Sequence, residues 1–303
     1  MQAIRFAAAV MVIKRINYDV VSAGYDQRYR SGGPSGIAEA LRALARRVKA
    51  RYVLEVGCGT GHWLTLMQDC EIRCGLDCSA GMLNKARQKG GSLDLVRGTA
   101  MGLPFREGAF DFVFCVHALH HFDDPPAFVE EAQRVLRTGG ALAIIGMDPL
   151  TEQDRWYLHE CFPGTREADL ARYPSGPAIV RWMEEVGFVK CERCLAARIV
   201  HDFIGREVLN DPVLHKDGTS QLSLLTEDAF LDGMARIEES IRLAEKHGRE
   251  IVFPMDIALP IVAGFASDAT EWGVSMEKRT PYDQRYGSRE LYWGKTPSAM
   301  CEG

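Results

Sequence analysis

The stretch from Val53 to Trp63, VLEVGCGTGHW, constrains the fold of this chain more than any other. A short apolar run that contains one acid, Glu55, leads into three glycines at alternate positions, Gly57, Gly59 and Gly61. Glycines there permit a tight strand-to-helix turn with positive φ and leave room for a ligand against bare backbone. Amide groups at the start of the following helix would face that ligand. The pattern therefore predicts a binding turn between a buried strand and a helix.

Strand and helix patterns alternate along the rest of the chain. We expect a helix at 36–49, a strand at 51–59, a helix at 62–70, a strand at 72–77, a helix at 80–88, strands at 93–99 and 110–116, a helix at 125–137, a Thr-Gly-Gly turn, and a strand at 141–147. This spacing predicts βαβ units and an α/β fold with a parallel sheet covered on both faces. Ligands of such sheets bind beyond the carboxyl ends of the strands, where the glycine turn lies.

Composition narrows the class of protein. The chain has 303 residues, 47% of them hydrophobic, which favours one main domain with a large core. A net charge of -5 argues against a protein that coats a polyanion. Residues 1–50 hold nine Lys and Arg against three Asp and Glu. We interpret Arg42, Arg46, Arg47 and Lys49 as a solvated helix face; the alternative is a patch for nucleic acid or an anionic substrate.

Cysteine usage indicates a reducing compartment. Nine cysteines without a cleavable signal sequence predict free thiols and a cytoplasmic location. Cys191 and Cys194 form a C-x-x-C, but the segment reads as a strand, which sends the two sulfurs to opposite sides. We therefore expect no metal site. The apolar segment 3–13 is too short to span a bilayer, so we expect no membrane span.

Two acids indicate the kind of ligand. Glu55 stands beside the glycine turn, where a carboxylate suits a cationic amine and would repel a diphosphate. Asp77 ends the next strand, and an acid there can accept hydrogen bonds from both hydroxyls of a ribose. A ribose at one end and an ammonium at the other are both present in S-adenosylmethionine.

Five segments, VLEVGCGTG, GLDCSAGML, GTAMGLPFREGAFDFVF, ALHHFDDP and RVLRTGGALAI, occur in an order and spacing that resemble class I S-adenosylmethionine-dependent methyltransferases. The likeness is greatest to the ubiquinone/menaquinone-biosynthesis type and runs from about residue 18 to 265. It implies a Rossmann-like, doubly wound, seven-stranded, mostly parallel sheet with helices on both faces. It also implies an N-terminal helical lid, a helical insertion before the last strand, and S-adenosylmethionine as the cofactor.

The resemblance also implies roles for individual residues around the cofactor. The methionine part would lie against Gly57, Cys58, Gly59, Thr60 and Gly61, the ribose on Asp77, the adenine beside Cys78, Met82, Thr99, Ala100 and Met101, and the sulfonium near Val116 and His117. Thr99 stands where family members often have an Asp that bonds the adenine amino group. A hydroxyl can still make one hydrogen bond, so we expect binding to survive.

Candidate catalytic residues follow the fourth and fifth strands. His117, His120 and His121 lie at a strand end, where a base with a pKa near neutral would serve an acceptor that must lose a proton. The competing interpretation is packing or helix capping. Asp148 points toward the same rim; its alternative role is to cap a helix that begins near Thr151.

The remaining segments predict covers for the site. Residues 1–50 form the predicted lid, in which Tyr18 and Tyr25 share one helical face and Tyr25 closes over the cofactor together with Tyr29; the alternative is ordinary core aromatics. Residues 51–266 form the methyltransferase domain, with an insertion at about 203–247 that covers the acceptor pocket.

The C-terminal tail, residues 267–303, repeats a motif of the lid. YDQRY occurs at 25–29 and again at 282–286, so the tail resembles the start of a second methyltransferase. Coincidence in a flexible terminus is the alternative. A second methyltransferase domain or a second copy of the chain are therefore the partners to consider.

These observations predict methyl transfer to a small-molecule acceptor by in-line displacement, with S-adenosylhomocysteine as a product. The alternatives are an RNA-modifying methyltransferase and a non-catalytic S-adenosylmethionine-binding subunit. The absence of an aromatic-rich basic strip argues against nucleic acid as a partner. The atom that accepts the methyl group, whether oxygen, nitrogen, carbon or sulfur, is left open because all four occur on this scaffold.

Overall fold

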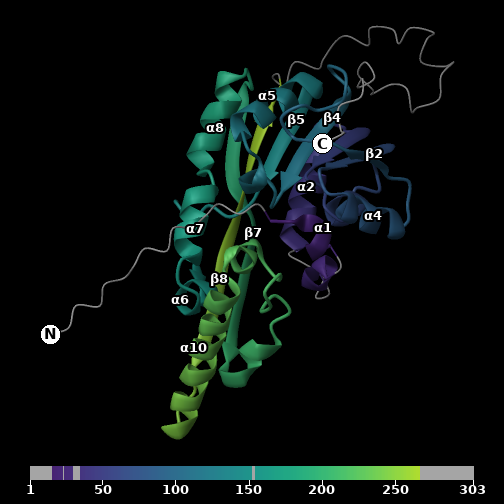
Figure 1. Ribbon diagram of the computed structural model, residues 1–303. Helices are drawn as coiled ribbons and strands as arrows, with labels where there is room; N and C mark the ends of the chain where they lie inside the picture. The colour runs from purple at the N-terminus through teal and green to yellow at the C-terminus, as the bar shows by residue number, and fades with distance from the viewer. Residues whose placement is uncertain (1–15, 23, 30–34, 152–153, 267–303) are drawn as a thin grey trace, which may run out of the picture.

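The computed structural model describes residues 16–22, 24–29, 35–151 and 154–266 (Figure 1). The tail at 267–303 and the whole N-terminal apolar segment at 3–13 lie outside the described residues, so the predictions for them stay predictions. The strands are β1 (Tyr52–Val56), β2 (Ile72–Asp77), β3 (Asp94–Arg97), β4 (Phe110–Val116), β5 (Leu136–Ile145), β6 (Arg155–Trp156), β7 (Lys190–Ile204) and β8 (Val252–Phe265). The helices are α1 (Tyr18–Val21), α2 (Ser35–Arg47), α3 (His62–Thr65), α4 (Ala80–Gln88), α5 (Pro125–Val135), α6 (Tyr157–Cys161), α7 (Thr165–Arg172), α8 (Gly176–Glu185), α9 (Ser220–Leu224) and α10 (Glu227–Lys246), with 3-10 helices η1 (Tyr25–Tyr29), η2 (Leu119–His121) and η3 (Gly205–Asn210).

One mixed sheet organises the described residues. Its strand order is β3-β2-β1-β4-β5-β8-β6, and β7 pairs with β8 on the other side. The pairs among β1 to β5 are parallel and the pairs of β8 are antiparallel, which confirms the predicted mostly parallel α/β sheet. The sheet has eight strands where seven were expected. The extra strand is the two-residue β6, which pairs with the part of β8 that extends beyond β5.

Helices cover both faces of the sheet. Along β4, Phe112, Phe114 and Val116 belong to one buried cluster, while Val113 and Cys115 belong to another. The first cluster includes residues of α2 and the second includes residues of α5 and α8. This alternation is what a strand buried on both sides requires.

Two long strands, β7 and β8, form an antiparallel ribbon. Figure 1 shows β7 and β8 leaving the sheet together, with α10 and η3 at their far end and α6 and α7 beside them. The chain between the two strands contains η3, α9 and α10, so a helical insertion stands where one was expected. Within the part of the chain that the structure describes, none of the helices combines the length and the apolar composition needed to cross a membrane.

Three local predictions were wrong. The helix expected at 62–70 ends at Thr65, and the chain continues in turns in which Leu66 and Met67 bond to carbonyls three residues back. The Thr-Gly-Gly segment is part of β5 and not a turn. The pairing of β5 with β4 shifts register between Phe110 and Phe112, and Gly139 has a φ of 78°. The lid is not one helix; a turn separates α1 from η1.

Candidate active site

The glycine turn has the predicted geometry. Gly57, Gly59 and Gly61 have φ values of 72°, 52° and 73°, in the left-handed region that favours glycine. A Cβ on Gly57 would lie 2.5 Å from the Cβ of Ala118, so this glycine is needed for packing. A Cβ on Gly59 would meet only Tyr25 Cε1, at 3.9 Å. The turn therefore leaves space above Gly59, on the side of the lid.

Asp77 joins the glycine turn to the end of β2. Its Oδ2 accepts a hydrogen bond from the Gly59 N–H at 2.8 Å, and its Oδ1 accepts one from the Ser79 N–H at 2.8 Å. Each carboxylate oxygen keeps a second lone pair for a ligand hydroxyl. Burial raises the pKa of Asp77, while the backbone N–H groups of Ser79 and Gly59 oppose this shift. The carboxylate is thus held in a fixed orientation at the edge of the turn.

Glu55 lies beneath the turn rather than above it. The residue is 1% exposed, and its Oε2 accepts a hydrogen bond from the Leu64 N–H of α3 at 3.0 Å. Burial raises the pKa of Glu55 well above its ordinary value, with a further contribution from the negative charge of Asp77. The side chain therefore supports the start of α3, and its contact with a ligand ammonium stays a prediction.

The first half of the lid is held to two parts of the site. Tyr18 forms a 2.6 Å hydrogen bond between its hydroxyl and His121 Nε2, after β4. Asp19 accepts bonds from the Ser79 hydroxyl at 2.6 Å and from the Gly81 N–H at 2.7 Å, at the start of α4. These bonds lower the pKa of Asp19.

The second half of the lid lies over the glycine turn. Asp26 accepts hydrogen bonds from the Thr60 hydroxyl at 2.5 Å and from Lys89 Nζ at 2.9 Å. The Tyr29 ring stacks on His62, with centroids 3.8 Å apart and planes 2° apart. Tyr18 and Tyr25 meet edge to face at 6.2 Å, although a turn separates their helices. We did not predict a role for Asp19 or Asp26 from the sequence, although each is the acid of a Tyr-Asp pair in the lid.

The other residues expected around the adenine and the sulfonium surround the same end of the sheet. Met82, Ala100 and Val116 are buried, at 1%, 5% and 5% exposure, whereas Cys78 and Thr99 are exposed. Cys58 is buried, and its sulfur packs under the turn near Gly75, where burial raises the pKa of the thiol well above its ordinary value. Its side chain therefore faces the sheet, and the backbone of Cys58 is what the turn offers to a ligand.

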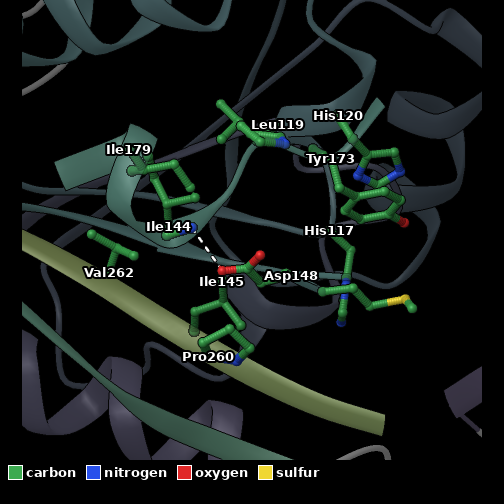
Figure 2. A pocket seen from close by; sticks show the side chains of 15 residues that line it. His117, Leu119, His120, Ile144, Ile145, Asp148, Tyr173, Ile179, Pro260 and Val262 are labelled. Atoms are coloured by element: carbon green, nitrogen blue, oxygen red, sulfur yellow. Dashed lines mark hydrogen bonds between the residues drawn. The ribbon is translucent and has the colours of Figure 1, made fainter. Parts of the chain in front are cut away.

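The predicted histidines lie together at the end of β4, where Figure 2 shows His117 and His120 lining one pocket. His117 has a positive φ of 52° and its N–H bonds to the Ile145 carbonyl at 2.8 Å. A non-glycine residue in this region is strained by about 1–2 kcal/mol, which is typical of functional loops. His120 stacks on Tyr173, with centroids 3.9 Å apart, and burial lowers its pKa well below the ordinary value. His120 is therefore neutral at pH 7.

Asp148 lines the same pocket but is engaged by protein donors. It is 2% exposed and accepts hydrogen bonds from the Gly176 N–H at 2.7 Å, the dashed line in Figure 2, and from Arg193 Nη2 at 3.3 Å. Thr151 donates to it from both its N–H and its hydroxyl. The expected helix near Thr151 is absent from the described residues, where that segment is a turn, and Asp148 instead joins this turn to the start of α8.

Comparison with known proteins places one segment of the chain in a protein family. Residues 54–144 match the methyltransferase domain family. The chain is 38% identical over 112 residues to demethylmenaquinone methyltransferase of Listeria welshimeri, which is 34% of this chain and 47% of the relative. It is 36% identical over 114 residues to the Mycobacterium ulcerans protein named "Probable phthiotriol/phenolphthiotriol dimycocerosates methyltransferase 2", which is 36% of this chain and 44% of the relative. The chain thus spans about half the length of these relatives.

A solved structure supports the fold over a longer stretch. A proposed methyltransferase of an antibiotic biosynthesis pathway from Anabaena variabilis superposes with a TM-score of 0.57 at 18% identity, covering 75% of this chain and 96% of that chain. The segment at 54–144 is a methyltransferase domain, and the resemblance to class I S-adenosylmethionine-dependent methyltransferases is confirmed.

The residues present fit S-adenosylmethionine, the cofactor that this family indicates. Gly59 has room for a Cβ beneath Tyr25, and the Asp77 carboxylate, which accepts from the Gly59 and Ser79 N–H groups, lies beside this bare backbone. Lys89 contacts the turn at the Thr60 hydroxyl, and it is neutralised there by its ion pair with Asp26. In the part of the chain covered by the structure, no group of three or more His, Cys, Asp or Glu could hold a metal ion.

Proposed function

We propose that this protein transfers a methyl group from S-adenosylmethionine to a small-molecule acceptor. One observation supports the proposal above all: Asp77 accepts a hydrogen bond from the N–H of Gly59 at 2.8 Å, so an acid suited to a ribose is fixed against a bare glycine turn that faces Tyr25 of the lid. The strand-end histidines His117 and His120 follow the neighbouring β4. A cofactor and an acceptor would therefore approach each other at one edge of the sheet.

The chain's own residues supply binding, orientation and exclusion of water. When bound, S-adenosylmethionine supplies a methyl group already activated on a sulfonium. The turn would hold its amino-acid part and Asp77 its ribose, while Tyr25 of the lid covers Gly59. Tyr18 and Asp26 tie the lid down on either side, which keeps water out of the site. Holding the acceptor in line with the methyl group would provide most of the rate enhancement.

A base is needed only if the acceptor must lose a proton. His117 and His120 are the candidates, and burial lowers the pKa of His120, which makes it a weaker base than an ordinary imidazole. Asp148 already accepts hydrogen bonds from Gly176, Thr151 and Arg193, so we assign it a positioning role rather than proton transfer.

The basic side chains of α2 are already engaged by protein groups, which favours a small-molecule acceptor over RNA. Arg47 makes a two-pronged ion pair with Glu192 and lies over the Phe265 ring, and Arg42 bonds the Leu66 carbonyl. Arg46 is 3.6 Å from Asp69. Cations engaged in this way do not form a phosphate-binding strip. The relatives are named as a demethylmenaquinone methyltransferase and a probable phthiotriol/phenolphthiotriol dimycocerosates methyltransferase, and neither name refers to RNA, which also supports a small acceptor.

The free cysteines indicate the cellular compartment of the protein. The cysteines of the described residues are all free, and burial raises the pKa of several of them, including Cys58 and Cys74. Such thiols are stable in a reducing environment, so we propose that the enzyme works in the cytoplasm.

Calorimetric titration with S-adenosylhomocysteine tests the proposal. The Asp77→Ala variant should bind about 5- to 150-fold more weakly, since about 1–3 kcal/mol of hydrogen bonding to a buried charged group is lost. Asp232 is an exposed acid on α10, and Asp232→Ala should bind like the wild type. Equal affinity of Asp77→Ala and wild type would contradict the placement of the ribose. Release of S-adenosylhomocysteine from S-adenosylmethionine with a metabolite pool, but not with RNA, would separate the small-molecule enzyme from an RNA-directed one.

A further inference from the structure

A second pocket lies at the edge of the sheet opposite the candidate active site. It has a volume of about 310 Å³ and lies between the last turns of α2 and the chain that links α3 to β2, so we call it the α2 pocket. Lys49 and Ala50 of its lining lead into β1 and Cys70 leads into β2, which places the pocket at the amino ends of these strands. The glycine turn follows the carboxyl end of β1, about 17 Å away along a strand of five residues. The α2 pocket is therefore separate from the glycine turn.

The floor of the α2 pocket is apolar. Ala45, Met67 and Cys70 are 6%, 3% and 8% exposed, and Leu66 and Ala50 are half-buried. The Cys70 thiol donates to the Ala50 carbonyl at 3.6 Å, and burial raises the pKa of this thiol to about 11, so it carries no charge at pH 7. Sites for small ligands have volumes of about 300–1,000 Å³ and mostly apolar linings. The α2 pocket is thus large enough for a short hydrocarbon chain.

Cations predominate at the opening of the α2 pocket. Arg42, Arg46 and Lys49 line it together with one acid, Asp69. Arg46 and Asp69 are 3.6 Å apart with side chains 72% and 80% exposed, so water and salt screen this pair. The three cations outweigh both Asp69 and the partial charge of about -0.5 at the carboxyl end of α2. The opening therefore carries a net positive charge.

The protein leaves donors of these cations available for one anion. Arg42 uses its Nε for the Leu66 carbonyl, and its terminal nitrogens make none of the described hydrogen bonds. Arg46 lies beyond hydrogen-bond distance of Asp69, and Lys49 has no hydrogen-bond or ion-pair partner within the described residues. These donors are too few for a row of phosphates, but they suffice for a single carboxylate.

The backbone of Lys49 also indicates a use for its side chain. Its φ is 51°, and within the described residues only Lys49 and His117 combine a positive φ with a side chain. The end of α2 is a Schellman motif, in which Ala50 N–H bonds the Ala45 carbonyl at 2.8 Å and Lys49 N–H bonds the Arg46 carbonyl at 3.1 Å. Glycine is the usual residue at the position of Lys49, because it has no strain there. A strained lysine that is kept beside a pocket points to a function of its ammonium group.

We propose that the α2 pocket is a second binding site, which takes a small amphipathic carboxylate. The carboxylate would bind Lys49 and the two arginines, since guanidinium groups match a carboxylate with paired hydrogen bonds. The alkyl or aryl tail would lie on the floor formed by Met67 and Cys70. Asp69 at the opening opposes a second negative charge, which favours a monoanion over a phosphate dianion. The proposal does not depend on the proposed methyl transfer.

Octanoate, 1-octanol and acetate are the probes that test the site on the full chain. Octanoate has both a charge and a tail, whereas 1-octanol lacks the charge and acetate lacks the tail. Calorimetry should show octanoate bound about tenfold or more tightly than either of the others. With ¹³C-methyl-labelled methionine, octanoate should shift Met67 and leave Met183, which is buried in the other core cluster, unchanged. Equal binding of octanoate and 1-octanol, or an unshifted Met67, would overturn the proposal.

Lys49→Gly separates the loss of binding from any loss of folding. The variant removes the ammonium and relieves the positive φ, so it should unfold about 2–4 °C above the wild type. It should bind octanoate about three- to tenfold more weakly, because one partly exposed charged contact is lost. Lys246→Ala removes an exposed cation from the end of α10 and should bind octanoate like the wild type. Wild-type affinity in Lys49→Gly would refute the role of this residue and with it the proposal.

Charge variants at the opening test the kind of ligand. Arg46→Gln should weaken octanoate binding about three- to tenfold, whereas Asp69→Asn should strengthen it about two- to threefold. Asp232→Asn, at an exposed acid of α10, is the matched control and should have no effect. Weaker octanoate binding in Asp69→Asn, or octyl phosphate bound more tightly than octanoate, would contradict a site for a monoanion.

Competition tests whether the site is a second one. Octanoate should still bind when S-adenosylhomocysteine is saturating, because the two sites lie at opposite ends of β1. Displacement of octanoate by S-adenosylhomocysteine would place it at the glycine turn and would refute the proposal. Octanoate binding in a protein that does not bind S-adenosylhomocysteine would support the second site and contradict only the proposed function.

Discussion

Replacement of Gly59 by alanine separates the folding of the glycine turn from its use as a binding surface. Gly59 has a φ of 52°, and an alanine there costs about 1–2 kcal/mol of the free energy of unfolding. The new Cβ meets only Tyr25 Cε1, at 3.9 Å, which is ordinary van der Waals contact and adds little. Gly90 has a φ of 73° and nothing within 4 Å of a Cβ, so Gly90→Ala should have the same cost without a contact.

The two variants should therefore differ in binding and not in stability. Both should lower the unfolding temperature by about 2–8 °C, at about 2–4 °C for each kcal/mol in a domain of this size. The methyl group of Gly59→Ala occupies the space that we assign to the cofactor, and overpacking there costs about 1–3 kcal/mol of binding energy. Calorimetry should then show S-adenosylhomocysteine binding weakened by about 5- to 150-fold in Gly59→Ala and unchanged in Gly90→Ala. Equal affinity in the two variants would refute the assignment of this space. A much larger loss of stability in Gly59→Ala would refute the stability argument.

Three further changes test the surroundings of the turn. Gly57→Ala should lose about 2–5 kcal/mol in urea unfolding, because backbone strain adds to a 2.5 Å approach to the Ala118 Cβ; the double variant with Ala118→Gly should recover part of this loss, and an additive result would speak against the clash. Glu55→Gln removes a carboxyl whose pKa burial raises well above 4.5 in the folded state. The folded wild type keeps this proton while the unfolded chain releases it, so wild-type stability falls as pH rises above 4.5 until Glu55 ionises in the folded state. The Gln variant should gain in relative stability as the pH rises above 4.5, and a difference that stays constant would argue against a raised pKa. Tyr18→Phe removes the 2.6 Å bond to His121 and should raise the KM for S-adenosylmethionine by about twofold to tenfold through a looser lid, whereas an unchanged KM would exclude this role.

Local chemistry explains what could be predicted from the sequence. The helix predicted at 80–88 has the same bounds as α4, and the structure shows that the Ser79 hydroxyl caps it by accepting from the Met82 N–H. The turn was predicted because three alternate glycines after a buried strand favour positive φ, and all three have it. The mostly parallel sheet followed from the alternation of strand and helix patterns. Each of these features depends on residues close together in the chain.

Contacts between distant residues could not be predicted. Asp26 bonds Lys89, and His159 bonds an Asp169 that nothing in the local pattern marks as its partner. The stack of Tyr173 on His120 joins two segments that become neighbours only when the sheet and its helices assemble. The same limit applies to α3, whose short length reflects the turns that lead into β2 rather than any helix-breaking residue. The roles of the individual site residues therefore stay predictions until a ligand is observed.

A crystal structure of the protein with S-adenosylhomocysteine tests the central claim most directly. The ribose hydroxyls should lie about 2.5–3.0 Å from the Asp77 carboxylate oxygens. The amino-acid end should lie against the backbone of Gly57 to Gly61. A nucleoside bound away from Asp77, or a glycine turn left without ligand while S-adenosylhomocysteine is bound elsewhere, would contradict the account.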